Sequence, residues 1–374
     1  MNDSNFSPAW RQLAFIGAAL LLTPVAWAAS GTEGASFLDI PVGSQPAALG
    51  SAYTAQAFNA YATIWNPAGL GSLDAVEVAG THVAYLQSIH YDFLGVAVPL
   101  CRHQEDGEDG NCLPRGFGAS VQYLGSGDIT AYNDQGVQNG SYSTSFAAYS
   151  LAYGQAISER LSLGFTGKAI RESLSDASAS AYAADVGSLY KAGDGLYLGA
   201  AVSNIGTAVK FVSSSDPLPL AARVGTTWQA IPSLDLSGEL VWRRTGLWSE
   251  HVGLEYRYQD VFSFRAGYDT THIQELSASA GLTAGVGIFL WGQEFAYAWV
   301  PYSNLGNTHY FTLTLRFANS PSALRMKTVS AVPPPTKPLP PEREADYNAL
   351  YQLLSGNETK ALQNRGGTSE QEQP

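Results

Sequence analysis

Residues 308–317, THYFTLTLRF, alternate between two kinds of side chain. The odd positions from 311 carry Phe, Leu, Leu and Phe, and the even positions from 310 carry Tyr, Thr, Thr and Arg. Successive side chains of a β-strand point to opposite sides of its sheet, so this period of two predicts a strand with one apolar face. The same period recurs in residues 234–243 and 262–268. The chain is therefore predicted to be all-β.

Working outward from this strand, residues 74–318 divide into about 14 such runs of roughly ten residues, the length that a tilted strand needs to cross a bilayer. Strands of this length and alternation predict a closed, antiparallel transmembrane β-barrel, and their even number would return both termini to the periplasm. Short connections are expected at residues 158–160, 192–195, 231–233 and 259–260, and longer ones at 126–144, 205–219 and 301–307. The predicted strand centres are Ala79, Val96, Ser120, Leu151, Thr166, Val186, Ala200, Val224, Gly238, Leu254, Phe264, Ala280, Ala296 and Leu313.

Composition agrees with a membrane barrel. Charged residues make up 14% of the chain, hydrophobic residues 45%, and the mean hydropathy is close to zero. A barrel gives this average because it turns apolar groups to lipid and small or polar groups to its lumen. The net charge of -12 argues against nucleic acid as a partner, since nucleic-acid binding needs a basic face.

The N-terminal residues predict export. An apolar run at 13–25 follows Arg11, and Ala26, Trp27 and Ala28 form a small-x-small cleavage site, so residues 1–28 are interpreted as a signal peptide. The alternative, a retained anchor helix, is less favoured because the run is shorter than the roughly 18 residues that a membrane helix needs. The expected location is the bacterial outer membrane, with its lipid as a partner.

Nine stretches, taken in order, resemble the PorV/PorQ family of outer-membrane proteins, which are relatives of the FadL fatty-acid transporters. They span most of the expected barrel. The matching stretches are residues 37–43 (FLDIPVG), 50–55 (GSAYTA), 65–70 (WNPAGL), 122–129 (QYLGSGDI), 203–206 (SNIG), 216–220 (DPLPL), 265–268 (RAGY), 297–301 (YAWVP) and 305–309 (LGNTH).

This resemblance implies a FadL-like barrel whose N-terminal segment, residues 29–73, folds inside it as a plug. One motif of the plug is singled out, formed by Trp65, Asn66, Pro67, Ala68, Gly69 and Leu70. Pro67 fixes φ, and Asn66 can bond to local backbone, so the motif either orders the plug or contacts a ligand directly. The resemblance also implies a break in the third strand, expected at residues 125–127, where the wall would open sideways.

Six charged residues are expected to face the lumen, because charge on the lipid-facing wall is unfavourable by about 2 to 4 kcal/mol at mid-bilayer. Lys168 is predicted to lie opposite Asp185, and the other four to lie on adjacent strands. Ion pairs that brace the plug are favoured over an ion-selective constriction. The six are Lys168, Asp185, Glu239, Glu255, Arg257 and Arg265.

Cys101 and Cys112 flank a short acidic loop and are predicted to form a disulfide, since the periplasm is oxidising. The six His residues show no short metal-ligand spacing, and no Ser or Cys lies in a nucleophile-elbow pattern. Neither a metal nor another cofactor is expected. Catalysis is the least favoured function, although widely spaced Ser, His and acidic residues are compatible with it.

Residues 319–374 change in composition. Residues 332–341, VPPPTKPLPP, predict an extended spacer, and apolar residues at helical spacing predict a short helix at 342–354, followed by a disordered end. This tail is expected in the periplasm, where it either docks onto a partner or has no function.

Two functions are compatible with these patterns. The PorV/PorQ resemblance implies a non-enzymatic accessory of protein export, which handles substrates of a type IX-like secretion system or their surface attachment. Its partners would be secretion components or exported proteins. The alternative is a FadL-like transporter whose ligand is a hydrophobic small molecule. Copurified secretion components would favour export, and lipid bound in the lumen would favour transport.

Overall fold

The computed structural model describes residues 33–85, 89–101, 113–127, 129–175, 177–211, 214–271, 273 and 277–317. The expected signal peptide, the loop with Cys112, and the tail from residue 319 lie outside the described residues, so the cleavage site, the disulfide and the tail helix remain predictions.

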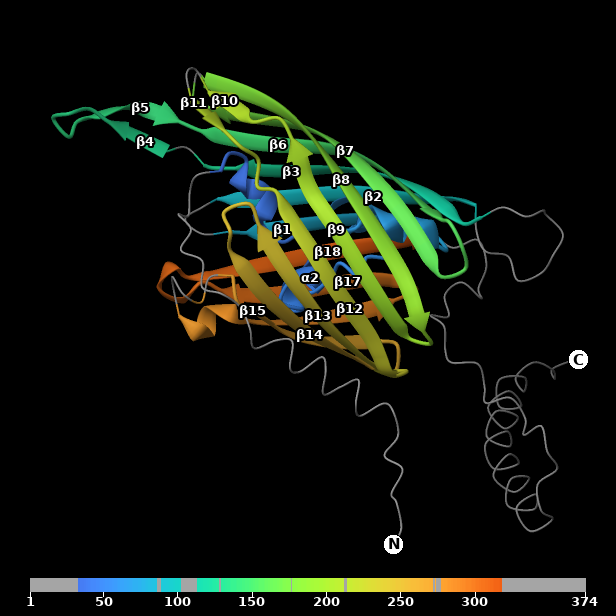
Figure 1. Cartoon of the computed structure of the whole chain (residues 1–374). Helices are drawn as coiled ribbons and strands as arrows, with labels where there is room; N and C mark the ends of the chain where they lie inside the picture. Colours follow the sequence, from blue (N-terminus) through green and yellow to red (C-terminus); the bar gives the residue numbers. More distant parts are fainter. Residues whose placement is uncertain are drawn as a thin grey trace, which may run out of the picture. The chain divides into compact units, whose positions relative to one another are not determined.

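Fourteen strands form a closed antiparallel barrel in the order β1-β18-β17-β16-β15-β14-β13-β12-β9-β8-β7-β6-β3-β2, which confirms the predicted fold class (Figure 1). Two small hairpins, β4–β5 and β10–β11, lie in connections. The barrel strands are β1 (Val76–Ala84), β2 (His90–Cys101), β3 (Arg115–Gly125), β6 (Thr144–Ala156), β7 (Leu161–Leu174), β8 (Ala177–Gly193), β9 (Leu196–Gly206), β12 (Ala221–Ile231), β13 (Leu234–Arg243), β14 (Trp248–Tyr258), β15 (Phe262–Asp269), β16 (Leu282–Leu290), β17 (Gln293–Pro301) and β18 (Asn307–Phe317).

One predicted strand centre is wrong. Ala280 lies in the 3-10 helix η4 (Ala278–Gly281), and the strand that it was expected to centre is β16, which begins at Leu282. The chain turns after β16 at Trp291 and Gly292, both of which have positive φ, of 53° and 79°. The other predicted centres all fall within a barrel strand.

The alternation of side chains sets the two faces of the wall. On β18, Phe311 and Leu313 are 42% and 45% exposed, whereas Thr312 between them is buried. On β15, Phe264 is exposed, whereas Ser263 and Arg265 are buried. The apolar faces of these strands therefore point outward, as the sequence predicts.

The two ends of the barrel differ in their connections. We call the end where β1 begins and β18 ends the turn end, and the opposite end the loop end. The predicted short connections lie at the turn end and the predicted long ones at the loop end. The short connections from β7 to β8 and from β13 to β14 also lie at the loop end. Figure 1 shows the hairpin of β4 (Ile129–Tyr132) and β5 (Gln138–Tyr142) projecting away from the loop end. The second hairpin, β10 (Val209–Phe211) with β11 (Ser214–Asp216), lies in the connection from β9 to β12.

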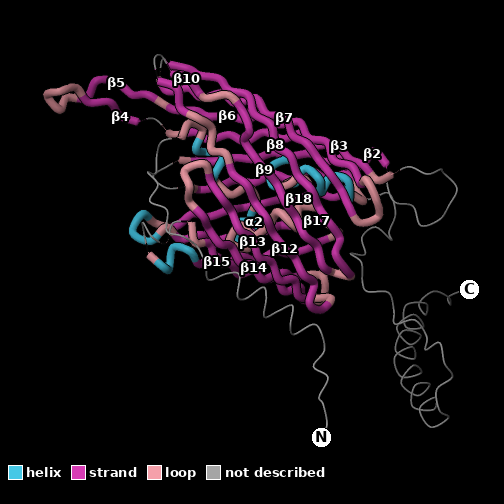
Figure 2. Tube along the Cα trace, in the orientation of Figure 1, coloured by secondary structure: helices cyan, strands magenta, loops and turns pink. Residues whose placement is uncertain are grey.

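Residues 33–73 lie inside the ring of strands (Figures 1 and 2). We call this segment the plug. It contains η1 (Ser36–Asp39), α2 (Ser44–Ala48), α3 (Ala62–Trp65) and η2 (Pro67–Ser72). Its side chains are mostly buried, and its polar groups bond to strands all around the wall, including β8, β13, β16 and β18.

A last short helix, η5 (Ser303–Leu305), lies between β17 and β18. In the described part of the chain, no helix is both long and apolar enough to cross a bilayer.

Candidate functional site

The contact surface between plug and wall is the candidate site, and the motif at residues 65–70 lies at its centre. Trp65 donates its Nε1–H to the carbonyl of Val42, 3.0 Å away. Asn66 Oδ1 accepts a hydrogen bond from the N–H of Ala68 at 3.2 Å and thereby caps the N-terminus of η2. Pro67 is the first residue of η2, a position where a backbone N–H is not needed. Residues 67–71 are all buried. These contacts are the ones expected of a motif that orders the plug, the first of the two roles considered for it, and the choice between the two roles remains a prediction.

Asn66 also fixes the motif to its surroundings. Its Nδ2 donates to the carbonyl of Thr54 at 2.9 Å and to that of Ser188, on β8, at 3.0 Å. The side chain is fully buried, so each of these bonds satisfies a group that water does not reach. One side chain thus links two parts of the plug to the wall.

Three glycines on the inner faces of β6, β7 and β8 form the surface on which the motif packs, which we call its seat. A Cβ at Gly154 would lie 2.2 Å from Pro67 O, one at Gly164 2.2 Å from Pro67 C, and one at Gly187 2.1 Å from Asn66 Oδ1. Real Cβ atoms do not come this close to other atoms, so the plug backbone packs directly on β6 and β7, and the Asn66 side chain packs directly on the backbone of β8. Sequence reasoning missed this seat, although each glycine occupies an inward position of its strand.

Glu239, on β13, is a second anchor. One carboxylate oxygen, Oε2, accepts the N–H groups of Tyr53 and Thr54 at 3.0 and 2.8 Å. The other, Oε1, lies 3.2 Å from Nη1 of Arg223, whose guanidinium is 5.2 Å from the ring centre of Trp65. The carboxylate is buried. Glu239 therefore joins the plug to the wall directly and through Arg223.

Glu255, Arg257 and Arg265 form a third group, on β14 and β15. Arg265 pairs with Glu255 at 2.7 Å and with Glu294 of β17 at 2.7 Å. Arg257 lies 3.4 Å from Glu255 and 2.8 Å from Asp235. Gln45 of the plug donates to Glu255 at 2.9 Å. These charges face inward, and they brace the plug through Gln45.

Lys168 and Asp185 form a buried pair at 2.7 Å, but they are not opposite each other as predicted. Lys168 faces Ala183 in the ladder, and Asp185 faces Thr166, because the β7–β8 turn begins at Ser175, which has positive φ. Lys168 reaches Asp185 diagonally and also donates to Asn204 at 2.9 Å. Asn204 in turn donates to the carbonyl of Pro219. This pair braces a loop-end connection rather than the plug.

His251, on β14, is an anchor that sequence reasoning did not single out. Its Nδ1 lies 2.7 Å from the carbonyl of Gly50 in the plug and 3.5 Å from Asp269. Its Nε2 lies 2.8 Å from Oγ of Ser249, and this hydroxyl oxygen also accepts a hydrogen bond from Nη1 of Arg243. A Ser, a His and an Asp thus lie together, but the imidazole bonds to a plug carbonyl at shorter distance than to the carboxylate. The contact that the structure shows for His251 is therefore with the plug.

The expected break in the third strand is not within the strand. β3 pairs with β2 and with β6 over its full length, and Gly125 is its last residue. Residues 125–127 therefore form the exit from β3 into the loop end, and the wall is closed along β3. The implied sideways opening has no counterpart at this strand.

Comparison with known proteins places the fold. No protein-family model matches the chain, and no curated protein matches it. Among solved structures, the toluene transporter TodX of P. putida has a TM-score of 0.51 at 12% identity, over 74% of this chain and 99% of its own. The monoaromatic hydrocarbon channel CymD has a TM-score of 0.50 at 11% identity, over 74% and 97%. A FadL homologue of Pseudomonas aeruginosa has a TM-score of 0.47 at 12% identity, over 74% of this chain and 98% of its own.

At these identities the likeness shows a shared fold. The chain has the barrel architecture of TodX and CymD, which agrees with the FadL-like fold that the sequence resemblance implies. The narrower assignment to PorV/PorQ remains a prediction.

Proposed function

We propose that this chain is an outer-membrane channel that passes hydrophobic small molecules, the FadL-like alternative raised by the sequence. The observation that carries the proposal is a closed barrel filled by its own N-terminal segment, with a fold shared with a toluene transporter and a monoaromatic hydrocarbon channel. Neither of those two proteins, as described, is an enzyme, so the proposal is also non-enzymatic.

The outward face of the wall supports a bilayer location. Large apolar side chains such as Leu151, Phe165, Val224 and Phe295 are more than half exposed there. In water such a surface would be unfavourable, whereas in a membrane barrel it is the band that contacts acyl chains. The buried ion pairs lie on the opposite, inward face, where the bilayer does not reach them.

The inner surface near the loop end supports a hydrophobic ligand. Phe37 of the plug packs against Phe146 of β6 with ring centres 5.9 Å apart, and Ile170, Ala181 and Leu218 are buried in the same apolar cluster. An apolar molecule that enters from this end would contact this cluster beside Glu172, which faces Phe146 in the ladder. Its passage requires the plug to shift.

Uptake by lipid vesicles tests the proposal. Toluene crosses a plain phospholipid bilayer unaided, so the vesicles carry lipopolysaccharide in their outer leaflet. Vesicles of this kind that contain the full chain are expected to take up toluene several-fold faster than those that contain unfolded protein, and a hydrophilic trisaccharide no faster. Equal rates for toluene with and without the folded chain would contradict the proposal.

The export function stands on the sequence resemblance to PorV/PorQ, and no described contact favours it over transport. Affinity purification from outer membranes, with and without residues 320–374, separates the two functions. Secretion components or exported proteins that copurify with the full chain would favour export and would identify the tail's partner if they are lost with it.

A further inference from the structure

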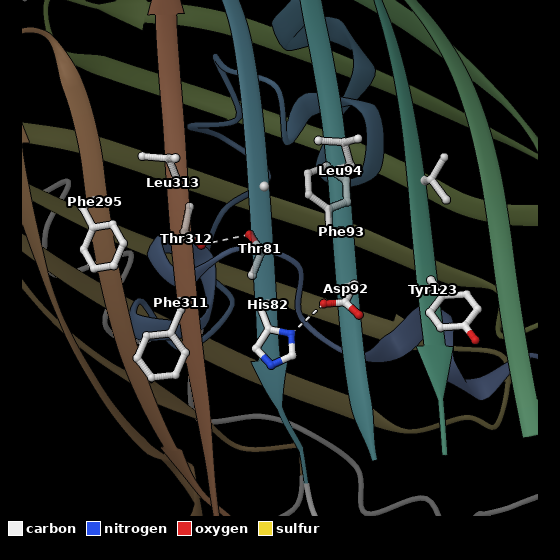
Figure 3. Close-up of a pocket in the computed structure, with 12 residues that line it drawn as sticks. Thr81, His82, Asp92, Phe93, Leu94, Tyr123, Phe295, Phe311, Thr312 and Leu313 are labelled. Atoms are coloured by element: carbon white, nitrogen blue, oxygen red, sulfur yellow. Dashed lines mark hydrogen bonds and ion pairs between the residues drawn. The ribbon is translucent and has the colours of Figure 1, made fainter. Parts of the chain in front are cut away.

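A groove of about 550 Å³ crosses the outward face of β17, β18, β1, β2 and β3 (Figure 3). Its floor is Gly80, where an added Cβ would meet nothing within 4 Å. Its sides are apolar and include Phe295, Leu313 and Leu94, each of which is about half exposed. The groove is therefore an open, apolar channel on the outside of the wall, separate from the plug.

The groove becomes polar toward the loop end. His82 and Asp92 lie opposite each other on β1 and β2, with Nδ1 of His82 2.7 Å from Oδ1 of Asp92. Figure 3 shows this pair beside Phe311 and Tyr123, with Leu313 and Leu94 farther along the strands. Both side chains are exposed. A polar pair on a lipid-facing wall is tolerated near the end of the strand, where the apolar band gives way to headgroups.

Two more histidines extend this polar end. His309 of β18 and His90 of β2 both face Ala84, the last residue of β1, from either side. They share the outward face with His82, so three of the chain's six histidines gather on three adjacent strands. The Tyr297 hydroxyl lies 2.8 Å from Nδ1 of His309, at hydrogen-bond distance. The ring centre of His90 lies 5.9 Å from that of Tyr123.

We propose that this groove is a binding site for one lipid of the surrounding bilayer. Its acyl chain lies over Gly80, and its phosphate-bearing headgroup lies against His90 and His309. Imidazole N–H groups donate hydrogen bonds to phosphate oxygens, and Asp92 is already engaged by His82. The inference rests on the membrane placement in the proposed function.

The direction of the polarity selects a lipid over other occupants. The groove runs from imidazoles near the loop end to bare apolar wall farther along the strands, and a lipid with its headgroup at the loop end has the same order of polar and apolar parts. A second copy of the chain would present its own apolar band and would make no use of the imidazoles. A wholly apolar solute would also leave them unused.

Native mass spectrometry of the detergent-purified full chain tests this site. The probes are palmitoyl-oleoyl phosphatidylglycerol and the diacylglycerol with the same chains, which lacks the phosphate. Gly80→Phe fills the floor. Gly238→Phe is the matched control, because Gly238 of β13 is also outward-facing and open, with Thr226 Cγ2 at 4.0 Å as the nearest atom.

The unaltered chain and Gly238→Phe are expected to retain one phosphatidylglycerol, and Gly80→Phe to bind it at least about tenfold more weakly. His90→Ala combined with His309→Ala is expected to lose the preference for phosphatidylglycerol over diacylglycerol and to keep diacylglycerol binding. Equal retention by the two Phe variants, or equal binding of both probes by the unaltered chain, would overturn the site. A dimer that Gly80→Phe disrupts would also overturn it.

Toluene uptake separates this inference from the proposed function. Gly80→Phe leaves the lumen unchanged, so the variant is expected to keep the unaltered rate of uptake. Loss of lipid binding with normal uptake supports both proposals. Normal lipid binding by the unaltered chain without any toluene uptake would contradict the channel and leave the lipid site in place.

Discussion

Gly164→Val is expected to prevent the plug from seating. The new Cβ would lie 2.2 Å from Pro67 C and 2.3 Å from Ala68 N, both of them backbone atoms, so no side-chain rotation relieves the clash. Overpacking a core usually costs about 1 to 3 kcal/mol, and a backbone clash on a fixed wall lies at or above the upper end of that range. We expect the free energy of unfolding to fall by roughly 3 kcal/mol or more.

The measurement is guanidinium unfolding in lipid vesicles, together with protease digestion of the folded protein. Residues 33–73 are expected to become cleavable in Gly164→Val. Gly167→Val is the matched control on the same strand, because Gly167 faces outward and its Cβ would meet only Phe165 Cε1, at 3.9 Å. Equal stability and equal protection in the two variants would show that the plug does not rest on β7.

Glu239→Ala is expected to loosen the plug and make the barrel leak. The substitution leaves the N–H groups of Tyr53 and Thr54 without their acceptor and Arg223 without its carboxylate. Removing one partner of a buried ion pair typically destabilises a protein by about 3 to 5 kcal/mol. We expect a loss of that size in the free energy of unfolding, and a rise in single-channel conductance of KCl.

Two further variants serve as controls for Glu239→Ala. Glu239→Gln keeps an oxygen for the plug N–H groups but loses the charge, so it is expected to fall between Glu239→Ala and the unaltered chain. Glu250→Ala removes a carboxylate from the outward face of β14 and is expected to change neither stability nor conductance by much. Conductance that is the same for all three variants would show that Glu239 does not hold the plug closed.

The wall was largely predictable from the sequence because its signal is local. In residues 311–317 and 262–266, the alternation alone shows which side chains face outward and which face inward, without knowledge of any partner strand. Ala280 was misplaced because residues 277–281, Ser-Ala-Ser-Ala-Gly, contain no large side chain whose alternation could mark a strand. They form η4 instead.

The plug contacts were only partly predictable because they depend on register across several strands. The sequence indicated that Glu239 and Glu255 face inward, but not that they bind Tyr53 and Gln45. The seat of the motif requires Gly154, Gly164 and Gly187, on three different strands, to lie side by side at one level along the barrel axis. The offset between Lys168 and Asp185 follows from the β7–β8 turn, which is centred one residue earlier than a direct pairing of these two residues would require, so that Lys168 faces Ala183 instead.

The central claim, that the plug occupies the bore and must move for a hydrophobic molecule to pass, is tested most directly by a cross-link. Ser44 of the plug and Thr312 of β18 have their hydroxyl oxygens 2.8 Å apart. A chain with both Ser44→Cys and Thr312→Cys is expected to form a disulfide between them in vesicles, to lose toluene uptake, and to regain it on reduction. The single variants and the unaltered chain, given the same reductant, are the controls. Failure of the two cysteines to cross-link, or undiminished toluene uptake by the fully cross-linked chain, would contradict the account.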